Sequence, residues 1–483
     1  MPTKASIQIL LNMEEGGNII RNVFGRSYKE AESIIIHASE GDLNFISPKG
    51  INFYGKNGGK KFGNFVAREE VATTTNKIDK VKEIELLTVL DKGSKNDNNI
   101  NSTTFQDGMV FGKAYHFKVK SYVQNPPANI ADIKWMLKYH SPSQNKWLEI
   151  PLSVKGDSVI ITMNDKDMCG RFIYLRAYIQ DPESEGEYKQ WKHNRFLWFD
   201  RTKVHKQIMD RIKDPWKINQ GNSSLCGMAA LYYAMAKKDA SAYEKLAKEL
   251  FRTGEYHIGS YVLKPHDKAL SMYETNPSDR NYKAMKMPDI DWIVLATTRS
   301  KESLNSQFVY NGFENGDIDM MKGISWPEML TRMCKEVAGF SSVEAIDLGL
   351  LEIAEKKGIS AKLYDALGDI DIMHLKNIVR KYKQGHTILM MIDSSMIDDE
   401  PGYNLKDLTT DSHWVVYEGG LNFIDVGESK FVGFKIYTWG YDTVNQIDEF
   451  KKPSPSSKIL IHAHQRIKIE SFKSNYYGYI EVF

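Results

Sequence analysis

Apolar and polar residues recur with two different periods along the chain, and the change comes near residue 201. Between residues 108 and 200 the apolar residues follow the two-residue period of half-buried strands, and turn residues separate the runs. This spacing predicts a β-sandwich of the immunoglobulin-like kind, with Trp135 in its core. The expected strands cover residues 114–123, 133–139, 158–162 and 171–179.

Beyond residue 201 the apolar residues recur every three or four positions, as on the buried face of a helix. Strand-like runs return after residue 385. Helices followed by strands are typical of an α+β domain, which we expect over residues 201–483. The expected helices cover residues 203–212, 240–251, 289–296, 326–336, 342–357 and 373–382, and the expected strands cover 386–392, 412–417, 431–440, 458–462 and 475–482.

The first 70 residues contain short apolar stretches that end at Gly41, Gly50 and Gly55. Glycine at repeated corners predicts a β-rich element, either a small β-solenoid or β-prism or an ordinary β-meander. Residues 71–107 are polar and rich in Lys, Asn and Thr, which predicts a linker with one strand over residues 83–89. The expected domains are therefore a β-rich element (1–70), a linker (71–107), a β-sandwich (108–200) and an α+β domain (201–483).

Composition and charge agree with a multidomain globular protein of 483 residues, 42% hydrophobic and 26% charged. The net charge of +2 lacks the concentrated basic excess of a general nucleic-acid binder. The longest apolar run, residues 225–236, is far below the ~20 residues that span a bilayer. The apolar run at residues 7–11 is soon broken by Glu14 and Glu15, which argues against a cleaved signal peptide.

Three cysteines, Cys169, Cys226 and Cys334, lie far apart in the sequence. No pair has the spacing of metal ligands, and an odd, scattered set does not form a disulfide framework. We therefore expect no metal, no cofactor and at least one free thiol.

Cys226 stands out because the polar turn at residues 222–224 gives way there to an apolar, helix-like run. A thiol at a helix N-terminus lies over unsatisfied N–H groups, which favour the thiolate. The Cys226 amide and the side-chain amide of Gln220 are candidates for an oxyanion hole. Gly227 is expected to leave room for a substrate backbone.

His413 is the candidate base, because it precedes an apolar strand-like run and would be held rigidly at the strand end. Taken separately, a cysteine before an apolar helix and a histidine before Val-Val are more often core residues. Their order, together with Gln220 upstream and Trp439-Gly440 downstream, favours a cysteine nucleophile with a histidine base.

This order resembles the papain-like cysteine peptidases, which carry a glutamine, a cysteine, a histidine and an Asn-Ser-Trp-Gly strand end. Gln220, Cys226 and His413 match the first three positions, and residues 437–440 match the last. The resemblance implies a papain-like fold over the C-terminal domain and an orienting residue for the histidine. Tyr437 stands where the family has that asparagine, which leaves Asp442, our first choice, or Thr438 for the role.

Residues 47–51, Ser-Pro-Lys-Gly-Ile, resemble strand punctuation in the β-prism repeats of type VI secretion spike proteins. The order of domains resembles antibacterial effectors of that class, which implies export without a cleaved signal and delivery into target cells. It also implies spike or tube components and a cognate immunity protein as partners, and a protein or peptide as substrate. The alternatives are a deamidase, a transglutaminase, a cell-wall amidase, or a spike-associated binding protein with an inert papain-like domain.

Overall fold

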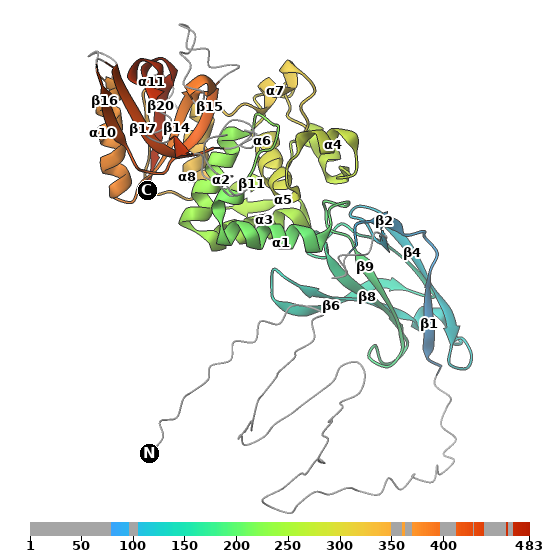
Figure 1. Ribbon diagram of the computed structural model, residues 1–483. Coiled ribbons are helices and arrows are strands. Elements are labelled where there is room, and N and C mark those ends of the chain that lie inside the picture. The colour runs from blue at the N-terminus through green and yellow to red at the C-terminus, as the bar shows by residue number, and fades with distance from the viewer. Residues whose placement is uncertain are drawn as a thin grey trace, which may run out of the picture. The chain divides into compact units, whose positions relative to one another are not determined.

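The computed structural model shows a mixed α/β protein with several antiparallel sheets (Figure 1). Residues Lys77–Phe483 group into one compact unit. The expected β-rich element over residues 1–70 lies outside the described residues. The structure describes residues 79–95, 105–348, 360–362, 370–396, 412–427, 429–438, 460–461 and 467–483.

Two antiparallel sheets share a core in the first part of this unit. Trp135 is fully buried in that core, as expected, and its indole N–H donates to the carbonyl of Gly156 at 2.8 Å. One sheet has the order β1 (Val81–Leu86), β4 (Ala114–Tyr122) and β7 (Ser158–Thr162). The other has the order β6 (Lys146–Lys155), β5 (Lys134–Ser141), β8 (Arg171–Tyr178) and β9 (Gly186–Lys192).

The stretch expected to be a linker contributes strands to this part. β1 pairs antiparallel with β4, and its Val81 and Ile84 side chains are buried. A second short pair joins β2 (Asp91–Gly93) to β3 (Gln106–Gly108). The strand expected over residues 83–89 corresponds to β1, which begins two residues earlier and ends at Leu86. The polar composition around β2 and β3 concealed them, because only one side chain of each is buried.

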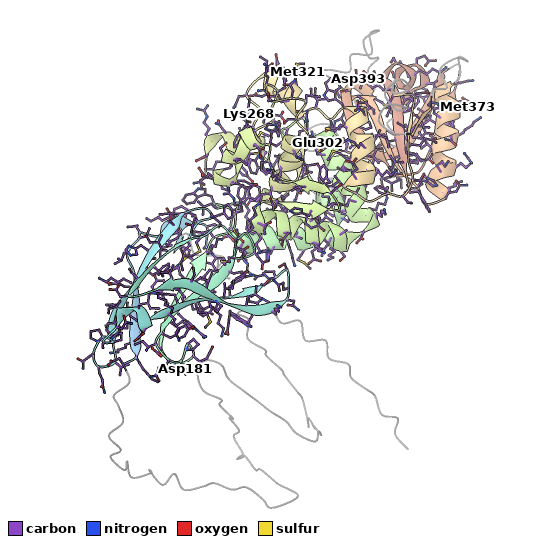
Figure 2. All side chains as sticks on the ribbon, turned by 180° about the vertical axis from the view of Figure 1, so that it is seen from behind. Asp181, Lys268, Glu302, Met321, Met373 and Asp393 are labelled. Atoms are coloured by element: carbon purple, nitrogen blue, oxygen red, sulfur yellow. The ribbon has the colours of Figure 1, made fainter. Side chains whose placement is uncertain are left out.

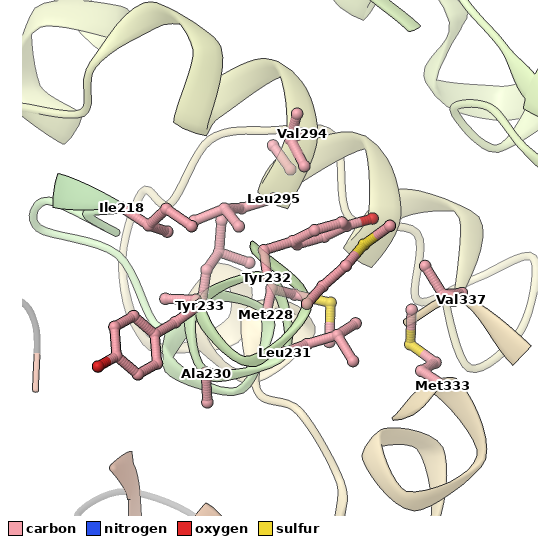
Figure 3. Close-up of a cluster of buried hydrophobic side chains, with 14 of the residues drawn as sticks. Ile218, Met228, Ala230, Leu231, Tyr232, Tyr233, Val294, Leu295, Met333 and Val337 are labelled. Atoms are coloured by element: carbon pink, nitrogen blue, oxygen red, sulfur yellow. The ribbon is translucent and has the colours of Figure 1, made fainter. Parts of the chain in front are cut away.

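Helices surround one buried helix, α2 (Cys226–Lys238), in the middle of the chain. Its residues 226–236 are all buried, so α2 has no solvent face over its first three turns (Figure 3). Neighbouring helices supply the apolar side chains around it. They are α1 (Arg201–Lys213), α3 (Ala240–Thr253), α5 (Asp289–Asp291) with the π-helical turn Trp292–Ala296, and α8 (Pro327–Glu336). The polar helix α6 (Thr297–Lys301) follows the π-helical turn and places the Thr298 hydroxyl 2.7 Å from that of Tyr232 on α2.

Local sequence signals place these helices well. The Asp239 carboxylate caps α3 by accepting from the amide of Ala242 at 2.9 Å. The helix ends at Gly254, which adopts a φ of 80° that other residues avoid. α8 has Pro327 at its first position, where the missing N–H costs nothing.

Smaller elements complete the helical part and include the helix that borders the candidate site, α7 (Asp317–Gly323). The others are two short 3₁₀ segments (Pro215–Lys217 and Asp267–Glu274), the hairpin β10 (Tyr256–Ile258) and β11 (Tyr261–Leu263), and α4 (Arg280–Met285).

The C-terminal part is a large sheet with helices on both faces (Figure 1). α2 and α8 pack on one face, whereas α10 (Ile370–Lys383) and α11 (Ile469–Asn475) pack on the other. The strand order is β13 (Ser360–Lys362), β12 (Val343–Ile346), β20 (Tyr476–Val482), β14 (Thr387–Asp393), β15 (Ser412–Tyr417), β17 (Ser429–Tyr437) and β16 (Asn422–Val426), and β18 (Leu460–Ile461) and β19 (Ile467–Lys468) also pair with β17.

One element expectation is wrong. The helix expected over residues 342–357 begins instead as the strand β12, which pairs antiparallel with β20 and parallel with β13. Ala345 and Ile346 are buried by that pairing. The partner strand β20 lies more than 130 residues later, so a local three-to-four spacing of apolar residues could not reveal it.

Candidate functional site

Cys226 is the first residue of α2, as the turn-to-helix pattern predicts. Its side chain is only 6% exposed, and Sγ lies 3.9 Å from the carbonyl oxygen of Ser224. Burial raises the pKa of the thiol to about 11, although the backbone amides of Trp414, Gly227 and Cys226 itself act to lower it. The thiol is therefore neutral at pH 7, with three N–H groups placed to receive negative charge on the sulfur.

The amide of Trp414 brings the sulfur close to β15. Its N–H acts to lower the pKa of the Cys226 thiol, so Sγ lies beside the backbone of Trp414. Within the described residues, β15 pairs with β14 along its length and with β17 at Val416 and Tyr417. Sγ therefore lies next to the residue that follows His413.

His413 lies near the start of β15, opposite Ile392 of β14, and is 7% exposed. Its Nε2 atom lies 2.5 Å from Oγ1 of Thr438, the residue that follows β17. Burial lowers the pKa of the imidazole to about 4, so the ring is neutral and able to accept a proton at pH 7.

Strand alternation determines from which face of the sheet the His413 imidazole projects. Trp414 and Val416 pack in the cluster that contains Cys226, whereas Val415 and Tyr417 pack in the cluster on the opposite face. His413 has the parity of the second pair, so its side chain leaves β15 on the face opposite to the Cys226 cluster.

Gln220 is buried just upstream of the cysteine and shapes the turn before α2. Its Nε2 donates to the carbonyl of Ser223, and the Ser223 hydroxyl donates to the carbonyl of Gln220 at 2.7 Å. The Gln220 Oε1 atom is buried without a hydrogen-bond partner. One N–H of the amide thus holds the turn, and the second is left for another acceptor.

The space beside Gly227 is filled, contrary to our expectation of room for a substrate backbone. A Cβ on Gly227 would overlap Cβ of Ser325 and lie 2.7 Å from its hydroxyl and 3.2 Å from Cδ1 of Trp414. The Trp414 indole N–H donates to the carbonyl of Ser325 at 2.9 Å. Gly227 therefore allows Ser325 and Trp414 to pack closely on the start of α2.

Tyr437 does not replace the orienting asparagine of the papain-like pattern. Its hydroxyl lies within hydrogen-bond distance of the carbonyls of Trp216 and Ile218, and its ring stacks on Tyr233 with centroids 4.0 Å apart. Tyr437 thus ties β17 to α2 and to the segment that leads to Gln220. Of the two alternatives, Thr438 contacts His413, whereas Asp442 lies outside the described residues, as do Trp439 and Gly440.

Glu314 is a site residue that sequence reasoning missed. Both of its carboxylate oxygens lie 3.0 Å from the amide of Ser224, and Oε1 also lies 2.9 Å from the Ser224 hydroxyl and 3.2 Å from that of Tyr310. Its charge acts on the Cys226 thiol. No local signal marks it, because it lies 90 positions from its main partner in a loop-rich stretch.

Metal and membrane features are also absent from the described part of the chain. No group of three or more His, Cys, Asp or Glu side chains in those residues is arranged to hold a metal ion. No helix there is both long and apolar enough to cross a bilayer. The three cysteines carry free, buried thiols.

Comparison with protein-family models finds no match, and comparison with curated proteins finds none either.

Proposed function

We propose that residues 201–483 form a papain-like cysteine hydrolase whose nucleophile is Cys226 and whose base is His413. The observation that supports this most strongly is the position of the Cys226 sulfur. It lies at the N-terminus of a buried helix and within reach of the Trp414 amide, next in sequence to a buried histidine. A cysteine buried only for packing needs no such set of N–H groups.

The proposed reaction starts from a neutral pair, because the thiol and the imidazole both lack charge at pH 7. His413 takes the thiol proton as Sγ attacks the substrate carbonyl. The Cys226 amide and the second side-chain N–H of Gln220 stabilise the oxyanion. His413 then gives its proton to the leaving amine and activates a water that hydrolyses the thioester.

Thr438 takes the orienting role in this proposal, because its hydroxyl is the described contact of His413 Nε2. That contact leaves Nδ1 as the ring nitrogen that serves the thiol. Asp442, which the sequence favours, is the alternative for this role.

Other acyl chemistry uses the same steps with a different acceptor. Ammonia as leaving group makes the enzyme a deamidase, an amine in place of water makes it a transglutaminase, and a peptide cross-link makes it a cell-wall amidase. A protein or peptide bond remains the first choice, since the resemblance to papain-like peptidases motivates the site. The non-enzymatic alternative is a spike-associated binding protein in which the domain is inert.

The biological setting follows from the order of the parts. The two packed antiparallel sheets before residue 201 support an immunoglobulin-like docking module, and the Ser47–Ile51 resemblance supports a secretion spike element. We therefore propose an antibacterial effector that is made in the bacterial cytoplasm, exported with spike or tube components and delivered into target cells. Its producer would need an immunity protein that blocks the site at Cys226.

The direct test is labelling with an electrophilic probe for cysteine proteases at pH 7. We expect labelling of native protein at Cys226, located by peptide mass spectrometry, and its loss in His413→Ala, because the neutral thiol needs the base. Cys334, buried on α8, is the internal control and should label only after denaturation. A native chain that stays unlabelled while the denatured chain is labelled at Cys226 would refute the proposed cysteine hydrolase.

Thr438→Val should slow probe labelling about tenfold, less than the roughly 10²–10⁴-fold that a general base contributes. Valine keeps the shape and removes the hydroxyl that contacts His413. Thr438→Ser keeps the hydroxyl and is the matched control, with a rate near wild type. Equal rates for valine and serine would assign the orientation of His413 to another residue.

The pH profile of the same labelling should also be unusual. Burial lowers the folded-state pKa of His413, so the neutral base persists as pH falls and is lost only near pH 4. An exposed histidine would be protonated near its ordinary pKa of about 6.5. An acid limb at pH 6–7 would show that the ring is hydrated and not buried as described.

A further inference from the structure

The Ser224 hydroxyl lies between two acceptors at the entrance to α2. Oε1 of Glu314 is 2.9 Å away and the carbonyl oxygen of Met320 on α7 is 2.8 Å away. A hydroxyl has one proton, so it can donate to only one of them. If Glu314 is ionised, whichever acceptor does not receive this proton faces the lone pairs of the Ser224 hydroxyl at hydrogen-bond distance.

One proton on Glu314 removes this conflict. The carboxyl O–H then donates to the Ser224 hydroxyl, which in turn donates to the carbonyl of Met320. The second carboxyl oxygen still accepts from the Ser224 amide at 3.0 Å. Every oxygen in this series of hydrogen bonds then has a suitable partner, which is impossible when the carboxylate is ionised.

The surroundings leave the carboxyl little space. A Cβ on Gly323 would lie 2.6 Å from Oε1 of Glu314 and would overlap the Ser224 hydroxyl, so the backbone of α7 closes one side of the pair. Glycine at position 323 is what permits this approach. α7 also carries the exposed side chain of Met321 (Figure 2), so the contact between Glu314 and Ser224 lies beside a surface helix.

The charged and titratable groups around Glu314 do not favour its ionised form. Asp319 on α7 adds a negative charge nearby, although Lys322 pairs with Asp319 at 2.7 Å. The Tyr310 hydroxyl donates to Oε1 of Glu314. The charge of Arg299 acts on Tyr310. Burial raises the pKa of Glu314 to about 7, with hydrogen bonds from Ser224 and Tyr310 acting against it.

Ionised Glu314 also acts on the nucleophile. Its negative charge opposes formation of the Cys226 thiolate, because like charges in a buried site repel strongly. The same carboxyl therefore holds the turn before the cysteine and sets the electrostatic cost of ionising it.

We propose that Glu314 is a positioning residue for Cys226 that works through a shared proton. In the protonated form it fixes Ser224 between α7 and the start of α2. On loss of that proton to solvent, it places a negative charge beside the thiol and suppresses the reactivity of Cys226. This inference rests on the proposed function, because it takes Cys226 as the reactive group.

The test follows alkylation of Cys226 by iodoacetamide between pH 5.5 and 9.5 in the full-length chain, with Glu314→Gln as the variant. The glutamine amide donates to Ser224 as the protonated acid does, but carries no charge. In wild type the rate should be level from pH 5.5 to 6.5, where His413 is already neutral, and should fall through pH 7 as Glu314 ionises. In Glu314→Gln it should stay level through pH 7, with a rate equal to that of wild type at pH 5.5 and about three- to tenfold above it at pH 9.

The matched control is Glu336→Gln, a surface carboxylate paired with Arg332 at the end of α8. Its profile should superimpose on that of wild type. Parallel profiles for wild type and Glu314→Gln, with circular dichroism unchanged, overturn the proposal. They leave the proposed function intact, because the probe experiment with His413→Ala decides that separately.

A second measurement needs neither reactive cysteine nor substrate. Infrared difference spectra of wild type between pH 6 and 8 should show loss of one protonated-carboxyl C=O band, and Glu314→Gln should lack that band. Wild type without the band at pH 6 means that Glu314 is ionised there, and the shared proton does not exist. If Glu314→Gln does not fold, the same titration is compared between wild type and Ser224→Ala. Loss of the Ser224 hydroxyl should shift the carboxyl band.

Discussion

Replacing Cys226 by serine should reduce amide hydrolysis by about 10⁴-fold or more and abolish toxicity when the chain is expressed in a bacterial host. Serine keeps the size of the side chain at the start of α2 and loses only the sulfur. A hydroxyl ionises far less readily than a thiol, and His413, whose imidazole is a weak base in its buried position, cannot compensate. Growth after induction and turnover of a peptide library measure the effect.

The control for Cys226→Ser is Cys334→Ala. Cys334 is fully buried on α8, so its loss costs packing but no chemistry. It should retain toxicity and turnover at levels set by stability alone. The double variant Cys226→Ser/His413→Ala should be no worse than Cys226→Ser, since residues that act as a unit are not additive. Toxicity that persists in folded Cys226→Ser protein would favour the inert, binding interpretation.

The position of Cys226 at the start of a helix is the part of the candidate site that the sequence predicts best, and the reason is local. A polar turn followed by an apolar run marks the start of a buried helix, and Cys226 is the first residue of that helix. His413 is marked in the same way, at the start of an apolar strand. Both signals lie within about ten residues of the group they identify.

The partners of these residues are not predictable in that way, because they come from distant segments. Thr438 contacts His413 across 25 positions, and Glu314 contacts Ser224 across 90. The papain-like order of residues drew attention to Tyr437, whereas the hydroxyl that contacts the His413 imidazole belongs to the next residue, Thr438. Ser325, nearly 100 residues after Gly227, explains a glycine that sequence alone associates with substrate access.

The fold shows the same division between local and distant information. Helices such as α3 are set by a cap, an apolar stripe and a terminal glycine, all present in their own sequence. β12 has no such signal, since Val343–Ile346 becomes a strand only because β20 and β13 lie on either side of it. The order of elements therefore predicted an α+β domain, while its strand order and its three layers required the structure.

Breaking the ion pair between Arg211 on α1 and Asp291 on α5 should cause the largest loss of stability that can be tested near the site. The Asp291 carboxylate accepts from Arg211 at 2.9 Å through Nε and at 2.6 Å through Nη2, and also from the amide of Asn219 at 3.0 Å. Both side chains are at least 95% buried. Asn219 precedes Gln220, so the pair also fixes the approach to the oxyanion turn.

Asp291→Ala should lower the free energy of unfolding by about 3–5 kcal/mol, because it leaves the Arg211 charge buried without a counter-ion and the Asn219 amide without its acceptor. An arginine guanidinium keeps its proton at neutral pH even without a counter-ion, so Arg211 cannot escape the cost by becoming neutral. Urea unfolding followed by circular dichroism measures the loss, and hydrogen exchange in α1 shows that it originates there.

Two variants separate the energy of the pair from the cost of an isolated charge. Glu244→Ala removes an exposed partner of Lys248 on α3 and should cost less than about 1 kcal/mol. Arg211→Met/Asp291→Leu replaces both buried charges with apolar side chains and should recover most of the loss, since two desolvated ions together gain little net energy. If Asp291→Ala costs no more than Glu244→Ala, Arg211 has an alternative partner or water reaches it. The segment leading to Gln220 must then be held mainly by Tyr437, whose hydroxyl lies within hydrogen-bond distance of the carbonyls of Trp216 and Ile218.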